Sequence, residues 1–284
     1  ICRHPENPLV SQVVAGLLVE EARRLVMPRA VEDGPATQLN LVHLPGAAGA
    51  LASVARSSSP RRLALVGAGA LGNWFGLALG LSGARVAVHV FDHDEIEETN
   101  LNRQVLFHGA VGELIAPVLA ARLEGWFPHL AMSGCAMKIE RDTAPLLLHA
   151  DALVACPDSF AVRSLLNDLG RQHRRPLISG GTTADSGSAL VYAPGSTACL
   201  SCRQRIEQLA ASERAPQGCG RRLEGSVVTS NAIVGALLVV LLRGLLAGRP
   251  EPGTLEYDGR PRNARLGRHS AWPACRCRGR GKGR

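Results

Sequence analysis

The chain has 284 residues, 46% of them hydrophobic and 20% charged, which is ordinary for a globular protein and enough to bury one large α/β core or two small ones. Its net charge of +8 arises at the carboxyl-terminal end, because residues 259–284 carry nine Arg or Lys and no Asp or Glu, whereas the rest carries 23 basic and 24 acidic residues. Such a tail, unlike a basic face, is usually solvated, so we do not expect nucleic acid as a partner.

The eight cysteines cluster in a way that indicates metal binding or catalysis in a reducing, cytoplasmic compartment rather than a disulfide framework. No segment has the regions of a secretory signal. Residues 1–60 carry the weakest signals. Residues 9–26 have apolar positions at helical spacing, residues 39–44 suit a short strand, and a Ser/Pro run at 57–60 suits a linker. We expect a helical and linker segment here, lacking some N-terminal residues because the chain starts at Ile1.

The pattern of residues 61–92 predicts a strand, a glycine turn, a helix and a second strand. An apolar run at 61–66 is followed by Gly67, Gly69 and Gly72, a helical pattern, and another apolar run at 85–91. Glycines let the backbone approach a phosphate, and a helix N-terminus offers unpaired N–H groups. Asp92 stands where an acidic side chain bonds a ribose hydroxyl. The unit predicts nucleotide binding, with ATP and NAD equally acceptable.

Residues 92–104 narrow the choice between ATP and NAD. They fit the pattern D-x-D-x-I-x-x-x-N-L-x-R-Q, with its polar positions at Asp92, Asp94, Asn100, Arg103 and Gln104. This pattern resembles the ThiF/MoeB and ubiquitin-activating enzyme superfamily, and the resemblance extends through most of residues 61–246. It implies a Rossmann-like α/β fold with a mainly parallel sheet flanked by helices. It also implies a homodimer that uses Mg-ATP to adenylate the C-terminal glycine of a ubiquitin-like or sulfur-carrier protein.

The resemblance assigns roles within this stretch. The glycines of the turn would hold the phosphates and Asp92 the ribose, while Leu71 and Asp94 would lie in the same cofactor site. Asn100, Arg103 and Gln104 would act on the phosphate charge, for which Arg is the natural neutralising group. Arg103 is therefore a candidate catalytic residue.

Residues 112–126 have helical spacing and end at a Phe-Pro pair, a helix stop. Members of the family usually carry a lysine at this helix start that touches the phosphates, but residues 112–117 contain none. Three consequences stay open: weaker neutralisation of the phosphates, compensation by an arginine, or a relative that does not adenylate.

Residues 152–156 predict a buried parallel strand that ends in Pro157, Asp158 and Ser159. By resemblance Asp158 binds Mg²⁺ beside the triphosphate, and a hard carboxylate oxygen suits that ion. Asp158 is also a good N-cap for the following helix, and the two roles are compatible. Cys156 is expected to be a small buried hydrophobe rather than a nucleophile.

Residues 176–181 and 187–192 predict further strands, and a cysteine pair follows them. Cys199 and Cys202 stand in a P-G-x-T-x-C-x-x-C pattern that resembles the family's zinc knuckle. Its second half is expected near the C-terminus, where Cys275 and Cys277 have a CxC spacing instead of the usual CxxC. We predict a four-cysteine structural zinc site, with two separate free pairs as the alternative.

Residues 215–225 are a Gly/Pro/Arg-rich crossover loop in which related enzymes often carry a nucleophilic cysteine. Cys219 fits that role, and the neighbouring arginines would favour its thiolate. A spare thiol or an extra metal ligand is the alternative. Residues 226–246 are the one candidate membrane span, but we interpret them as a buried helix and expect no membrane contact. Residues 254–258 predict a last strand.

We therefore predict three segments: the N-terminal residues 1–60, an adenylation domain at 61–258, and the cysteine pair with a basic tail at 259–284. The predicted function is adenylation of a carrier protein, followed by thioester formation or sulfur transfer at a cysteine. The alternatives are a non-catalytic nucleotide-binding scaffold of the same fold and, less favoured, an NAD-dependent oxidoreductase.

Overall fold

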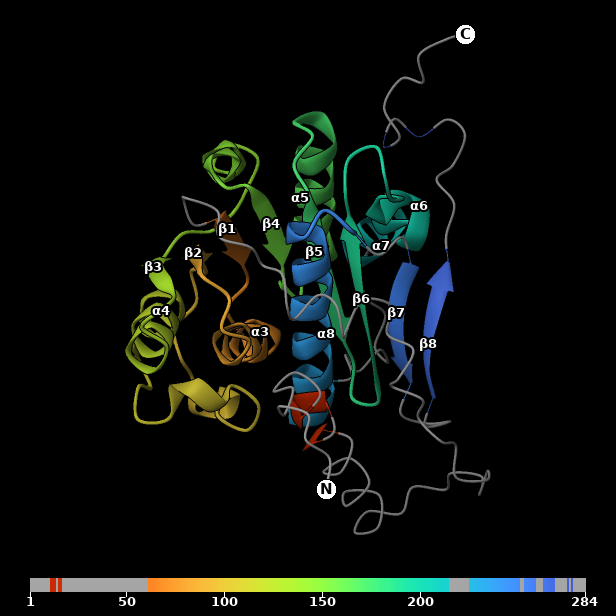
Figure 1. The fold of residues 1–284 in the computed structure, drawn as a ribbon. Helices are drawn as coiled ribbons and strands as arrows, with labels where there is room; N and C mark the ends of the chain where they lie inside the picture. Colours follow the sequence, from red (N-terminus) through yellow and green to blue (C-terminus); the bar gives the residue numbers. More distant parts are fainter. Residues whose placement is uncertain are drawn as a thin grey trace, which may run out of the picture.

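The structure is a computed structural model that describes residues 11–13, 15–16, 61–214, 225–250, 253–258, 263–268, 275 and 277. Its framework is an eight-stranded sheet with the order β3-β2-β1-β4-β5-β6-β7-β8 (Figure 1). The strands are β1 (Arg61–Val66), β2 (Val86–Phe91), β3 (Ala131–Cys135), β4 (Ala152–Ala155), β5 (Leu177–Thr182), β6 (Ser186–Tyr192), β7 (Gly253–Asp258) and β8 (Asn263–Arg268). The first five strands in the sheet order, from β3 to β5, pair in parallel. Strands β6, β7 and β8 extend the sheet with antiparallel pairs. The predicted Rossmann-like, mainly parallel sheet is confirmed.

Helices cover both faces of the sheet, so each buried strand carries apolar side chains on both sides. On β1, Leu63 and Leu65 belong to one core cluster and Ala64 and Val66 to the other. The first cluster lies under α3 (Ala70–Leu81), α4 (Ile115–Trp126) and α8 (Val228–Leu246). The second lies under α5 (Phe160–Gln172), α6 (Leu200–Gln204) and the 3₁₀ helix η4 (Ala144–His149). Helix α7 (Ile206–Arg214) packs on α5, and η2 (Glu98–Asn100) and η3 (Val105–Phe107) lie between β2 and α4.

The long apolar segment is confirmed as a buried helix. Among the described residues, α8 alone is long and apolar enough to cross a membrane, yet 78% of its apolar window is buried inside the fold. It crosses α3 closely, because a Cβ on Gly235 would lie 2.7 Å from the backbone carbon of Trp74. Its polar start is also used: Asn231 Oδ1 accepts from Thr182 Oγ1 at 3.0 Å, and Ser230 Oγ donates to the Thr183 carbonyl at 2.7 Å. These bonds fix the helix to the β5–β6 turn.

Some boundaries differ from the predictions. Residues 254–258 are not the last strand, because β8 pairs with β7 as a hairpin beyond it. Helix α4 starts at Ile115 rather than at residue 112, since Gly112 has a φ of 87° that a helix cannot contain. Near the N-terminus, residues 11–13 and 15–16 are helical as expected, and Gln12 Nε2 donates to the α8 carbonyl of Ala232 at 2.9 Å. The predicted strand at 39–44 lies outside the described residues.

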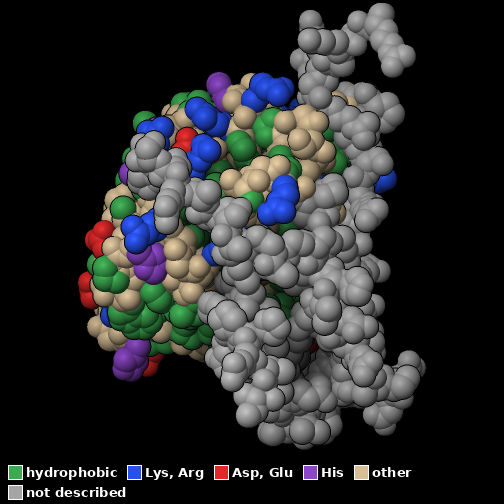
Figure 2. Space-filling model, viewed as in Figure 1, with side chains coloured by type: hydrophobic (Ala, Val, Ile, Leu, Met, Phe, Trp, Pro, Cys, Tyr) green, Lys and Arg blue, Asp and Glu red, His purple; other side chains and the backbone are tan. Residues whose placement is uncertain are grey.

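The near-neutral body has an uneven charge distribution. Exposed arginines precede or begin strands at the amino edge of the sheet, among them Arg61, Arg62, Arg85 and Arg174. Most Lys and Arg side chains visible in Figure 2 lie in the upper half of that view. Exposed acidic residues follow β2 at the opposite, carboxyl edge: Asp94, Glu95, Glu97 and Glu98. The two edges therefore differ in electrostatic character, although the tail accounts for the net charge.

Candidate nucleotide site and thiol cluster

The glycine turn after β1 lies against the end of β4. Gly67 has a φ of 86°, and a Cβ on it would come within 2.5 Å of Pro157 N, so only glycine fits this left-handed, crowded position. A Cβ on Gly72 would lie 2.4 Å from the Gly67 carbonyl oxygen, which explains the close contact between the turn and α3. Gly69 precedes α3, whose first turn has no acidic residue and whose cap has no side-chain hydrogen bond. The N–H groups at this helix start thus face the carboxyl edge, where anions bind α/β sheets.

Asp92, directly after β2, is bonded to that turn. Its Oδ2 accepts from Ala68 N at 2.7 Å and its Oδ1 from Asp94 N at 3.0 Å. Burial raises the pKa of the Asp92 carboxyl, although the two backbone N–H groups act in the opposite direction. A carboxylate oxygen accepts more than one hydrogen bond, so Asp92 can support the turn and still accept from a ribose hydroxyl. Asp94 is exposed, and its carbonyl oxygen accepts from Ile115 N at 3.0 Å.

The predicted phosphate-contacting residues lie on two consecutive short turns. Gln104 Nε2 donates to Asn100 Oδ1 at 3.2 Å, and a Cβ on Gly69 would lie 3.4 Å from the same nitrogen. The Gln104 amide therefore lies beside the glycine turn. Its Oε1 is buried and has no partner among the described residues, an atom able to accept from a ligand. Arg103 instead donates locally from Nη1, to the Thr99 carbonyl at 3.1 Å and to Asn102 Oδ1 at 2.9 Å.

Sequence reasoning missed Asn73, which joins these two parts. Its side chain is 0% exposed on the apolar helix α3. Nδ2 donates to the carbonyls of Ala68 and Gly69 at 3.0 and 3.2 Å, and Oδ1 accepts from Leu106 N at 2.9 Å. One amide thus connects the glycine turn to the segment after Gln104. The available sequence signal was a single polar residue inside the apolar run ALGNWFG. A buried amide needs hydrogen-bond partners, so Asn73 could have been expected to join neighbouring segments.

Asp158 lies after β4, the sheet neighbour of β1. Helices α3 and α5 follow these strands on opposite faces, and a ligand crevice forms at such a switch point. Asp158 is exposed, and its carboxylate makes no hydrogen bond within the described part of the chain. The N-cap of α5 is Ser159, whose hydroxyl accepts from Val162 N, so Asp158 is not the cap. Nearby, the buried Arg163 donates from Nε and Nη2 to the Pro157 carbonyl at 2.9 and 2.7 Å and holds this loop.

Leu71 is buried on α3 rather than at the crevice surface. Cys156 is buried and burial raises the pKa of its thiol to about 12, in keeping with a packing role. The predicted nucleophile Cys219 lies outside the described residues, and so does most of its loop. The region before α4 carries an acidic residue, Glu113, and residues 112–117 contain no lysine.

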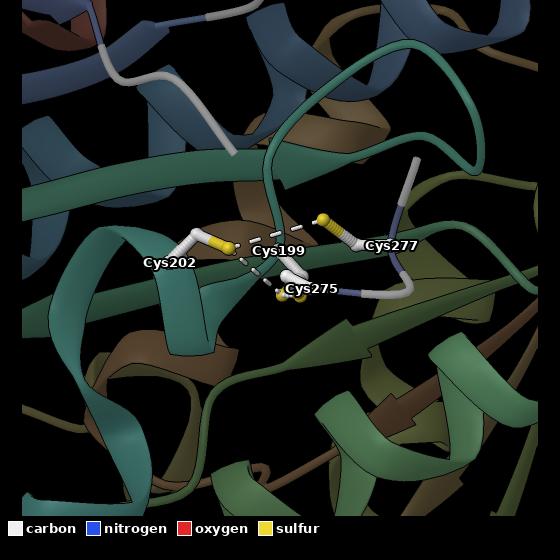
Figure 3. A group of neighbouring side chains, drawn as sticks. All are labelled: Cys199, Cys202, Cys275 and Cys277. Carbon is white, nitrogen blue, oxygen red and sulfur yellow. Dashed lines mark hydrogen bonds between the residues drawn. The ribbon is translucent and has the colours of Figure 1, made fainter. Parts of the chain in front are cut away.

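Four cysteines from two distant segments gather at one point (Figure 3). Sγ of Cys199 is 3.9 Å from that of Cys202 and 3.6 Å from that of Cys275, and Cys202 Sγ is 3.9 Å from Cys277 Sγ. All four sulfur atoms lie within 4.8 Å of one another. A tetrahedral zinc ion with Zn–S bonds of about 2.3 Å requires S–S separations of about 3.8 Å. The donor set and its spacing therefore fit zinc, and both thiols of the CxC pair reach the cluster.

Helix α5 supports this cluster. Asn167 is 0% exposed, accepts from Leu200 N at 3.0 Å and donates to Ser201 Oγ at 2.9 Å. Those two residues lie between Cys199 and Cys202. The amide thus satisfies a free N–H group at the start of α6 and ties the first cysteine pair to α5. Sequence reasoning did not identify Asn167 either.

Known proteins resemble this chain in sequence and in fold. The ThiF family model matches residues 36–280. The adenylyltransferase and sulfurtransferase MOCS3 of Anopheles gambiae is 31% identical over 206 residues, which cover 69% of this chain and 44% of that protein. Human ubiquitin-like modifier-activating enzyme 7 is 33% identical over 165 residues, 54% of this chain and 16% of that protein. The chain thus spans less than half of either relative's length.

Among solved structures, E. coli MccB with ATP has the same fold. It superposes with a TM-score of 0.64 at 22% identity, covering 76% of this chain and 65% of that one. Since the family model matches most of the sequence, and the fold agrees with it, this chain belongs to the ThiF family.

Proposed function

We propose that this chain uses ATP to adenylate the C-terminal glycine carboxylate of a ubiquitin-like or sulfur-carrier protein. One observation carries the proposal: the glycine turn, Asp92 and Asp158 follow the carboxyl ends of three adjacent strands, β1, β2 and β4. Gln104 lies beside the same turn, and its buried Oε1 has no hydrogen-bond partner among the described residues. Family membership and the names of the relatives, which are adenylyltransferases or modifier-activating enzymes, support this chemistry.

In the proposed reaction a carboxylate oxygen of the carrier attacks the α-phosphorus of ATP. The bond from that phosphorus to the oxygen bridging to the β-phosphate breaks, and pyrophosphate leaves with the electron pair. No proton needs to move, so the protein contributes alignment and charge stabilisation. The glycine turn and the start of α3 would hold phosphate oxygens, Asp92 a ribose hydroxyl, and Asn100, Arg103 and Gln104 the charge that builds on the phosphates.

Two metal ions fit the proposal. Asp158 offers a solvent-accessible carboxylate at the crevice, and Mg²⁺ is commonly held by one or two carboxylates together with substrate phosphates and water. Bound there, Mg²⁺ would neutralise charge on the leaving pyrophosphate. The ligands for a structural zinc would be Cys199, Cys202, Cys275 and Cys277.

Several finer features remain part of the proposal. Residues 61–258 would form the adenylation domain, and the segment at 259–284 would complete the zinc site. The Cys219 thiolate would attack the acyl carbon of the acyl-adenylate, break its bond to the phosphate oxygen and release AMP as the thioester forms, or it would take part in sulfur transfer. The chain would act as a homodimer in a reducing, cytoplasmic compartment. The alternative of a non-catalytic scaffold is favoured by the missing lysine at residues 112–117. An NAD-dependent oxidoreductase has no such support, because the chain belongs to the ThiF family.

The test is ATP–pyrophosphate exchange with a panel of carrier proteins that end in two glycines. Carrier-dependent exchange that disappears in Asp158→Ala and falls strongly in Arg103→Ala supports adenylation. Binding of Mg-ATP and of a carrier without exchange supports the scaffold. If the chain binds no ATP, both proposals are wrong.

A further inference from the structure

The N-terminus of α5 receives a carboxylate from another helix. Glu213, on the last turn of α7, accepts from Ala161 N at 3.0 Å, from Phe160 N at 3.3 Å and from Ser159 Oγ at 3.1 Å. The first turn of α5 contains no acidic residue of its own. Glu213 is 52 to 54 positions away in the sequence from the groups that it binds, so this cap is a tertiary contact that no local pattern predicts.

The position of Glu213 is unfavourable for its own helix. A negative charge near a helix C-terminus meets the negative end of the dipole, whereas the same charge at an N-terminus is stabilised. The contact with α5 offsets that disadvantage. Glu207, at the opposite end of α7, contacts Ser201 near the thiol cluster instead. Glu207 Oε1 also lies 3.9 Å from Nη1 of Arg171 in the last turn of α5, so the two carboxylates of α7 contact opposite ends of α5.

Together these contacts satisfy the whole first turn of α5. Phe160 N and Ala161 N donate to Glu213, Val162 N donates to Ser159 Oγ at 3.4 Å, and Arg163 N donates to the Ser159 carbonyl at 3.2 Å. The unpaired N–H groups of a helix start are normally taken by a nearby Ser, Thr, Asp or Asn. Asp158, one residue before the cap, is such a group, and with these N–H groups occupied it has no donor left to bind there.

We propose that Glu213 is a positioning residue that occupies the start of α5 and so keeps the Asp158 carboxylate free for a divalent cation. The inference rests on the proposed function, because it assumes that Asp158 meets the metal of a bound metal–nucleotide complex. It explains why Asp158 can be near a helix start, be a good capping residue, and still make no hydrogen bond within the described residues. Without the Glu213 carboxylate, Asp158 turns towards Phe160 N and Ala161 N and leaves the crevice.

The test compares Glu213→Gln with the matched variant Glu207→Gln on the same helix. Both remove a charge and keep the size of the side chain. Calorimetry measures the affinity for a non-hydrolysable ATP analogue, once with excess Mg²⁺ and once with a chelator. In Glu213→Gln we expect the gain in affinity due to Mg²⁺ to fall about tenfold, as for other groups that orient a metal ligand. Its metal-free affinity, and both affinities of Glu207→Gln, should stay as in the wild type.

The Asp158 pathway is tested by a double-mutant cycle. In an Asp158→Asn background, Glu213→Gln should cause no further loss of the Mg²⁺-dependent gain. Ser159→Ala, which removes one partner of Glu213, should cause a smaller loss of the same kind and serves if Glu213→Gln folds poorly. An unchanged gain in Glu213→Gln, an equal loss with and without Mg²⁺, or a further loss in the Asp158→Asn background overturns the inference. Failure of adenylation would instead appear as absent pyrophosphate exchange in the wild type, while Glu213→Gln still loses part of the Mg²⁺-dependent gain in nucleotide affinity.

Discussion

Replacing Asn73 by Ala should both destabilise the fold and weaken nucleotide binding. The substitution removes three hydrogen bonds between 2.9 and 3.2 Å from a side chain that is 0% exposed. The Gly69 carbonyl keeps the helical bond from Asn73 N, but Leu106 N and the Ala68 carbonyl lose their amide partner. An unsatisfied buried group costs about 1–3 kcal/mol, so two of them lower the free energy of unfolding by about 2–6 kcal/mol.

Equilibrium unfolding in urea measures this loss, with the exposed Gln172→Ala on α5 as a control expected within about 0.5 kcal/mol of the wild type. Asn73→Asp is a sharper probe. It keeps an acceptor for Leu106 N but directs a carboxylate at two carbonyl oxygens, so it should be no more stable than Asn73→Ala. Affinity for an ATP analogue should fall as well, because the glycine turn and the Gln104 segment lose their link. A loss below about 1 kcal/mol with unchanged nucleotide affinity would refute the reasoning.

Three further predictions concern metal, pH and thiol chemistry. The purified protein should contain about one zinc ion per chain; Cys277→Ser should lose it and melt at a lower temperature, whereas Cys135→Ser should retain it, as measured by elemental analysis and calorimetry. Burial raises the pKa of the Asp92 carboxyl in the folded protein, so the folded state favours the protonated side chain. The resulting contribution to the free energy of unfolding is present below the ordinary pKa range of Asp and is lost as the pH rises through the raised pKa. Asp92→Asn should therefore gain in unfolding free energy relative to the wild type across that window, and a constant difference would contradict this. Because burial raises the pKa of the Cys156 thiol to about 12, iodoacetamide at about pH 8 should label Cys156 only after unfolding, which peptide mapping would detect.

Strong local patterns made much of the sheet predictable. The apolar runs of β1 and β4 are buried on both faces over residues 63–66 and 152–155, which continuous hydrophobic segments allow, whereas β2 alternates buried and half-buried positions before its last residue. Strand β3 was missed because its sequence AMSGC is small and mostly exposed, and its pairing with β2 rather than its composition makes it a strand. Strand β8 was missed for a similar reason, because NARLGR has no clear alternation and gains its conformation from the hairpin with β7.

The site was less predictable wherever it depends on tertiary contacts. Motif spacing indicated Asp92, Gln104 and Asp158, and their binding roles stay predictions. Asn73 and Glu213 belong to no motif, since their hydrogen bonds join segments 33 and more than 50 positions apart. The sequence offered both capping and metal binding as roles for Asp158, and only the positions of Ser159 and Glu213 show that other groups occupy the cap.

The thiol cluster has a consequence for the unfolded chain. Cys202 and Cys277 are 75 positions apart, and α7, α8 and the β7–β8 hairpin lie between them. A metal that stays bound to both pairs turns this stretch into a closed ring even when its helices and strands have melted. The chain-entropy relation for a cross-link of that span gives about 4.5 kcal/mol. Much of the stabilisation by metal should therefore come from a lower conformational entropy of the unfolded chain. The contacts of the folded state do not show this contribution.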